Sequence, residues 1–151
     1  MKKKKQQSHY GPGFVYAFHD RQAIREIREI REIQIQGVTL CKIGLSRTPR
    51  TRRYFLSREY ESDLEIKAIA FTMNMKVTED LLHYIFSAHN ELRIQKLDGK
   101  NLDGYTEWFR VTPLRLKLIQ IMVFTMAILV NLAYLVALIS ACMYLFYFLC
   151  G

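Results

Sequence analysis

CKIGLSRTPRTRR, residues 41–53, is the stretch that decides how this chain folds. It predicts the end of a strand, a tight turn at Gly44 and the start of a helix. Thr48 suits the N-cap of that helix, and Pro49 suits its first position, where a backbone N–H would have no partner anyway. We therefore expect a strand that leads through a short turn directly into a helix.

Arginines are concentrated on the first two turns of this predicted helix, at Arg50, Arg52 and Arg53. A helix N-terminus already favours an anion, and guanidinium groups add donors and positive potential there. Gly44 has no Cβ, so a ligand can approach the main chain beside them. The stretch predicts a site for a backbone phosphate, although a solvated arginine face is the plainer interpretation of the same pattern.

The chain as a whole is basic, and its charge is confined to its first part. Its 151 residues include 22 Lys and Arg against 14 Asp and Glu, a net charge of +8, and every charged residue lies at or before Lys117. A basic soluble part suits a polyanion, either nucleic acid or an anionic lipid surface.

The cysteines exclude two classes of site. Cys41, Cys142 and Cys150 are too few and too scattered for a disulfide framework or a zinc site, and the four histidines do not supply ligands at metal-site spacing. A reducing compartment is therefore expected.

Three segments precede the decisive stretch. Residues 1–12 read as a basic disordered tail that contains four consecutive lysines. Residues 14–18 are aromatic and β-branched, which favours a strand. Residues 20–34 contain three Arg-Glu-Ile repeats, which predict a charged helix or extended arm inserted before a second strand at residues 35–44.

Three further elements are predicted after the decisive stretch. Residues 64–71 alternate as a strand, with the even-numbered apolar residues on one face. Residues 77–94 form an amphipathic pattern typical of a helix, with Thr78 as a candidate cap. Residues 107–111 predict a short closing strand. The fold class expected for residues 13–112 is α+β, a small antiparallel sheet of three to four strands flanked by helices.

The remaining residues, 113–151, predict a single C-terminal transmembrane helix. Residues 118–149 carry no charge, and a helix of that length reaches about 48 Å against a hydrocarbon core of about 30 Å. Asn131, inside this range, is either a helix contact or a tolerated amide. Arg115 and Lys117 flank the near end, so the positive-inside rule places the N-terminal domain of a single-pass protein in the cytosol.

Five short motifs occur in order along the chain: Phe14-Val15-Tyr16, Lys42-Ile43-Gly44, Arg52, Glu79 with His83, and Glu107-Trp108-Phe109. Together they resemble the GIY-YIG nuclease superfamily. The Lys-Ile-Gly form is typical of one branch, the DNA-binding domain family named after an open reading frame of bacteriophage T-five. The resemblance covers roughly residues 13–115 and implies the same small antiparallel sheet with flanking helices.

The resemblance implies a DNA-binding domain and, where the family cleaves, hydrolysis of a phosphodiester with one Mg²⁺. Glu79 would hold the metal, and Arg52 would neutralise charge on the scissile phosphate. Tyr16 would position or deprotonate the attacking water, and Lys42 would bind phosphate. The residues implied to contact nucleic acid are Lys42, Arg50, Arg52, Arg53 and His83.

The sequence also departs from the family pattern. Lys42 stands where many relatives have tyrosine, the gap between Tyr16 and Lys42 is longer than usual, and the asparagine of the cleaving enzymes has no clear counterpart. Three hypotheses stay open: a membrane-anchored DNA-binding domain that acts as an Mg²⁺-dependent endonuclease, a binding module of the same fold without catalysis, and a tail-anchored protein whose basic domain binds anionic lipid. The sequence leaves the oligomeric state open.

Overall fold

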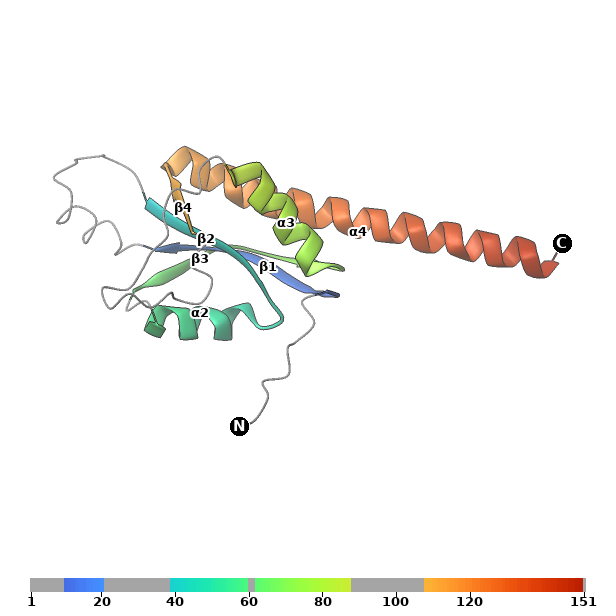
Figure 1. The fold of residues 1–151 in the computed structure, drawn as a ribbon, viewed down its shortest axis with the longest axis horizontal. Helices are drawn as coiled ribbons and strands as arrows, with labels where there is room; N and C mark the ends of the chain where they lie inside the picture. Colours follow the sequence, from blue (N-terminus) through green and yellow to red (C-terminus); the bar gives the residue numbers. More distant parts are fainter. Residues whose placement is uncertain (1–9, 21–38, 60–61, 88–107, 151) are drawn as a thin grey trace, which may run out of the picture.

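The computed structural model describes residues 10–20, 39–59, 62–87 and 108–150 (Figure 1). Its elements are β1 (Gly13–Asp20), β2 (Thr39–Ser46), α2 (Pro49–Glu59), β3 (Leu64–Thr72), α3 (Met75–Phe86), β4 (Trp108–Val111) and α4 (Pro113–Cys150). The strands form one antiparallel sheet in the order β3-β1-β2-β4. The α+β class predicted from the sequence is confirmed. The Arg-Glu-Ile repeats and residues 1–9 of the basic tail lie outside the described residues.

Two apolar layers hold helices against opposite faces of the sheet (Figure 1). On one face α2 contributes Leu56, which packs with Tyr16, Phe18 and Trp108. On the other face lie α3 and the first half of α4. This layer is built from alternate residues of the same strands and from the two helices: Val15, Ala17, Cys41, Ile43, Ala68, Ala70, Leu82, Phe86, Phe109, Val111, Ile119, Val123 and Ala127.

Strand β3 does not keep one apolar face along its length, so the prediction of a single even-numbered face is wrong. The pairing of β1 with β3 shifts between Ala17 and Phe18, where a bulge interrupts the ladder. Before the shift, Leu64 and Ile66 pack in the α2 layer. After it, Ala68 and Ala70 pack in the opposite layer. A bulge adds one residue to one strand and so exchanges its two faces.

The helix starts follow cap chemistry. Thr112 accepts a hydrogen bond from Arg115 N at its side chain, and α4 begins at Pro113 as predicted. Helix α3 begins two residues earlier than predicted, because Asn74 rather than Thr78 is its N-cap and accepts from Val77 N at 3.2 Å. Thr78 lies inside the first turn, where its hydroxyl is 2.8 Å from that of Thr72.

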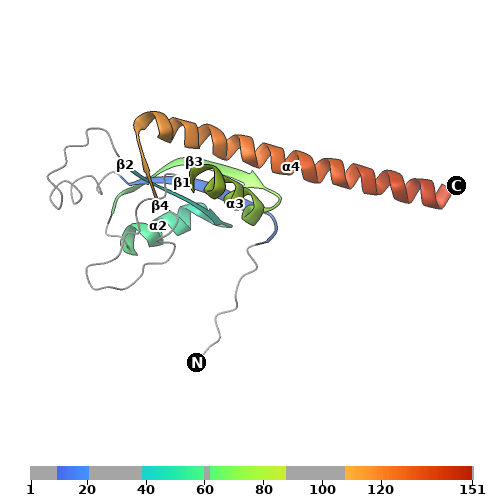
Figure 2. The same ribbon diagram turned by 45° about the horizontal axis from the view of Figure 1, so that its top comes forward.

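Helix α4 has two halves with different surroundings (Figure 2). The docked half, residues 113–131, places Ile119, Val123, Ala127 and Val130 against the domain, and these side chains are buried. The projecting half, residues 132–150, runs beyond the sheet, and all of its residues are exposed. Among the described residues, α4 is the one helix that is long and apolar enough to cross a membrane.

Candidate nucleic-acid interface

Tyr16 on β1 and Gly44 on β2 face each other, and the tyrosine ring occupies the space that a side chain at position 44 would need. They are register partners, and a Cβ added to Gly44 would stand 2.6 Å from the Tyr16 hydroxyl oxygen. Any larger residue at position 44 would displace the tyrosine ring. The ring is buried and stacks on Phe18, with centroids 3.9 Å apart and planes 13° apart. Within the described structure, Gly44 therefore makes room for Tyr16, whereas the sequence suggested room for a ligand.

Lys42 lies on the same face of the sheet as Tyr16 and is fully buried. Its register partners are Phe18 on one side and Trp108 on the other. The ammonium nitrogen is 5.5 Å from the centre of the Trp108 ring, which is cation–π distance. An ammonium removed from water needs such compensation, because an isolated buried charge is very costly. The structure thus makes Lys42 a core residue of the α2 layer.

The arginines of α2 divide between the two sides of that helix. Arg52 is half-buried and lies one turn before the core residue Leu56, on the side of α2 that faces the sheet. It therefore shares a layer with Tyr16 and Lys42. Arg53 donates from Nη1 to the Leu64 carbonyl oxygen at 3.3 Å.

The outer side of α2 carries three exposed residues, Arg50, Tyr54 and Arg58. They are four residues apart, so they lie one above another on the helix. Arg47 is also exposed and lies in the turn just before the helix. The Arg58 guanidinium is 5.9 Å from the Tyr54 ring centre, and the first turn has no acidic residue. Arg47, Tyr54 and Arg58 were not selected from the sequence, although the spacing of four from Arg50 was a signal that could have found Tyr54 and Arg58.

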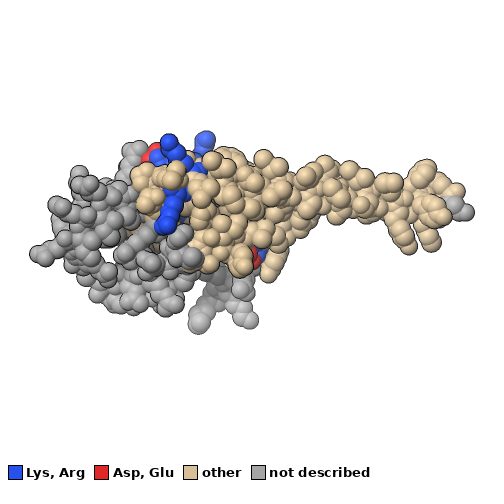
Figure 3. Space-filling model, turned by 90° about the horizontal axis from the view of Figure 1, so that it is seen from above, with Lys and Arg blue, Asp and Glu red and all other residues tan. Residues whose placement is uncertain are grey.

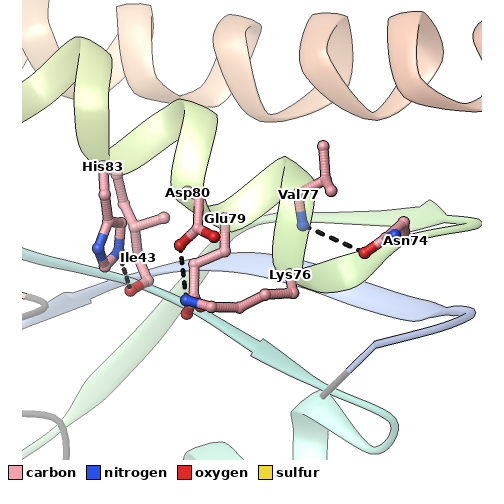
Figure 4. A network of polar contacts seen from close by, with 7 residues as sticks. All are labelled: Ile43, Asn74, Lys76, Val77, Glu79, Asp80 and His83. Atoms are coloured by element: carbon pink, nitrogen blue, oxygen red, sulfur yellow. Dashed lines mark hydrogen bonds and ion pairs between the residues drawn. The ribbon is translucent and has the colours of Figure 1, made fainter. Parts of the chain in front are cut away.

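Glu79 and His83 come from α3, which covers the opposite face of the sheet (Figures 1 and 4). The His83 Nε2 atom is 3.1 Å from the carbonyl oxygen of Ile43, the residue between Lys42 and Gly44. Glu79 lies one helical turn before His83 and is buried. The structure therefore places the predicted residues on two sides of the sheet. Tyr16, Lys42 and Arg52 lie in the α2 layer, and the Glu79–His83 pair lies on the helix across the strand.

Lys76 lies beside Glu79 on α3, and it was not selected from the sequence. Its ammonium nitrogen is 3.4 Å from Glu79 Oε2 and 2.5 Å from Asp80 Oδ1 (Figure 4). The hydrogen bond to Asp80 raises the pKa of Lys76, so it stays charged. The i,i+3 and i,i+4 spacing to two acids was the sequence signal. Lys76 thus places a fixed positive charge beside the carboxylate expected to hold a metal.

The side chains that could bind a metal ion determine which metal this region could hold. No group of three or more His, Cys, Asp and Glu side chains gathers among the residues that the structure describes. A hydrated Mg²⁺ takes one or two carboxylates and fills the rest of its octahedron with water and phosphate oxygens, so the carboxylate of Glu79, 3.4 Å from the Lys76 ammonium, would be its protein ligand. The buried thiol of Cys41 offers no alternative, because burial raises its pKa to about 12 and keeps it neutral.

Comparison with known proteins finds one family. The family model described as the T5orf172 domain matches residues 13–123, from the start of β1 into the docked half of α4. No curated protein matches the chain, and no solved structure does. The match covers the described elements that carry Tyr16, Lys42, Arg52 and Glu79, together with the core residues Ile119 and Val123.

Proposed function

The chain belongs to the T5orf172 domain family, and we propose that it binds nucleic acid, with DNA as the ligand, through the arginine-bearing surface of α2. The observation that carries this proposal is the exposed row Arg50, Tyr54 and Arg58 on a helix whose first turn has no acidic residue, together with the exposed Arg47 just before that helix. Guanidinium groups in a row suit successive phosphates of a backbone, and an exposed aromatic ring among them adds a surface for a base or sugar.

Binding is tested with the full-length chain in a non-ionic detergent and a fluorescent DNA duplex. The variant Arg47→Gln/Arg50→Gln removes two exposed charges, one at the start of α2 and one in the turn before it, and Arg53 is left intact because it also bonds the main chain of β3. We expect a loss of about tenfold or more in affinity and a shallower salt dependence, by about 0.9 per phosphate contact removed. The matched control Arg115→Gln/Lys117→Gln removes the same charge from α4 and should bind as the wild type does. Equal weakening by both variants would contradict the proposal.

DNA cleavage is a second candidate function. We propose it together with a relationship of this domain to the GIY-YIG nucleases. The support for cleavage is the residue types of Glu79 on α3 and Arg52 on α2, since a carboxylate and a guanidinium are the groups that phosphodiester hydrolysis uses, although the two helices cover opposite faces of the sheet. Mg²⁺ bound at Glu79 would supply Lewis-acid chemistry at the phosphate. Arg52 would hold the negative phosphate oxygens. Tyr16 would orient the attacking water, and the buried Lys42 would fix the position of β2 beside it.

A plasmid-nicking assay with added Mg²⁺ separates cleavage from binding alone. If the domain cleaves, Glu79→Gln and Arg52→Gln should each lower the nicking rate by about a hundredfold or more and leave duplex binding within a few-fold. Asp80→Asn is the matched control, since Asp80 also pairs with Lys76 but is exposed. Its rate should stay near that of the wild type. Binding by the wild type without nicking would leave the non-catalytic module as the function.

We further propose that α4 anchors this domain to a membrane, with the domain on the cytosolic side. The projecting half is apolar on all sides and exposed along its whole length, which suits lipid rather than water. The third hypothesis is that the basic domain binds anionic lipid. It predicts that the wild type and the Arg47→Gln/Arg50→Gln variant have equal affinity for DNA. It also predicts that only the wild type prefers phosphatidylserine vesicles over neutral ones.

A further inference from the structure

An amide side chain fastens α4 to the domain at the point where its two halves meet. Asn131 Oδ1 accepts from Met73 N at 2.7 Å, and Asn131 Nδ2 donates to the Phe71 carbonyl oxygen at 3.0 Å. Both partners belong to the main chain at the end of β3, the outer strand of the described sheet on that side. One turn later the Tyr134 hydroxyl accepts from Asn74 Nδ2 at 2.9 Å. The helix therefore leaves the domain rigidly, with no linker between the halves.

The length of the projecting half matches a bilayer. Burial along α4 ends at Val130, and residues 132–150 are exposed. As a helix these residues span about 28 Å, against a hydrocarbon core of about 30 Å. The docked half cannot share that environment, because Ile119, Val123 and Ala127 pack on the sheet. Lipid around that half would enclose the sheet, whose loops and edges carry main-chain groups that need water.

Apolar side chains surround the place where the helix leaves the domain. Phe71 is 48 % exposed, Met73 42 % and Val77 41 %, and all three belong to the turn between β3 and α3 or its flanks. This turn, residues 71–77, is the part of the domain fastened to Asn131 and Tyr134. By contrast, the exposed Arg115 and Lys117 lie near the start of α4, where Lys and Arg gather on the face in Figure 3. Lys117 is about 20 Å along the helix from Asn131.

We propose that only residues 132–150 cross the membrane and that the turn of residues 71–77 rests in the interfacial layer of the bilayer. The partner of the exposed apolar side chains of this turn, Phe71, Met73 and Val77, is thus lipid, at the level of the headgroups and first carbons of the chains. The domain sits directly on the membrane in one orientation, with Arg115 and Lys117 held away from the lipid surface. This inference rests on the proposed membrane anchor, and it replaces the range 118–149 by a shorter span.

Cysteine accessibility in the full-length chain, reconstituted in phosphatidylcholine vesicles, tests the boundary. In a background with Cys142→Ser and Cys150→Ser, which keeps the buried Cys41, one added cysteine at a time replaces Ile121 or Phe124 of the docked half, or Leu135 or Ile139 of the projecting half. All four native side chains are exposed and apolar, so they differ only in position. A water-soluble maleimide should label positions 121 and 124 at least about tenfold faster than positions 135 and 139.

The labelling results distinguish the proposed boundary of the membrane span from the proposed membrane anchor on which it rests. Slow labelling at all four positions would overturn the boundary and leave an anchor that begins near Leu118. Fast labelling at all four would overturn the anchor itself. For the turn, a fluorophore on Met73→Cys should be quenched by headgroup-labelled lipid several-fold more than one on Tyr84→Cys, an exposed position farther along α3. Equal quenching would contradict the placement of the turn at the interface.

Discussion

The two halves of α4 are both apolar but have different surroundings. Both are rich in Leu, Ile and Val, and the most apolar window of the helix has a mean hydropathy of 2.4. In the docked half, Ile119, Val123, Ala127 and Val130 form one buried stripe, whereas the projecting half has no buried residue. Hydropathy therefore detects an apolar helix, but only its contacts distinguish a core helix from one that lies in lipid.

The family match supports the same division. It ends at residue 123, inside the docked half, so part of this helix belongs with the sheet. The sequence placed a boundary between residues 112 and 113, which is the start of α4. The packing shows that the elements before this point lack part of their apolar layer without the helix that follows.

Truncation gives the largest expected difference between the two halves. A chain that ends at Asn131 keeps the buried stripe and should fold cooperatively. A chain that ends at Lys117 loses all four buried side chains of α4 and exposes the α3 side of the sheet, at a cost comparable to the whole stability of a small domain. Circular dichroism and urea unfolding of the two chains measure this. A cooperative transition in the shorter chain would show that α4 adds little to the core.

Substitutions of single isoleucines compare the two halves of α4 with the same residue type. Ile119→Ala removes a fully buried side chain and should lower the free energy of unfolding by about 2–5 kcal/mol. Ile128→Ala in the same half and Ile139→Ala in the projecting half remove side chains that are 64 % and 50 % exposed. In detergent these two should change it by less than about 0.5 kcal/mol. Urea unfolding in one detergent compares all three, and a cost at Ile139 equal to that at Ile119 would contradict the division.

The sequence predicted the elements well wherever local chemistry decides. Thr48-Pro49 and Thr112-Pro113 mark the starts of α2 and α4, because a cap residue and a proline at the first position act within a few residues. The two faces of β3 were not predictable, since the bulge depends on pairing with β1. The N-cap of α3 is also set locally, by Asn74 and Val77 N, but was assigned to the neighbouring Thr78 instead.

The candidate site was predicted by residue type but not by environment. Arg52 was expected on the first turns of a helix and is found there. The burial of Lys42 beneath Trp108 depends on β4 pairing with β2 across a long stretch of sequence, and lysine is among the residues least often buried. The pair Lys76–Glu79 depends on side-chain geometry within α3, where Lys76 can equally turn to solvent.

Asn131 and Gln120 allow the smallest and most specific test, because both are amides of the docked half that bond the main chain of β3. Gln120 Nε2 donates once, to the Lys67 carbonyl oxygen at 3.1 Å, whereas Asn131 makes one bond with each end of its amide. With about 0.5–1.5 kcal/mol per bond, Asn131→Ala should cost about 1–3 kcal/mol and Gln120→Ala about half as much.

Asn131→Asp separates the two bonds of the amide. The carboxylate can still accept from Met73 N but cannot donate to the Phe71 carbonyl oxygen. Asn131→Asp should therefore lower the free energy of unfolding, but by less than Asn131→Ala does. Urea unfolding measures the cost, and amide hydrogen exchange at Met73 shows whether the end of β3 opens. Unchanged exchange in Asn131→Ala would mean that the packing of Val130 and the hydrogen bond between Asn74 and Tyr134 hold the helix to the sheet at the point where its two halves meet.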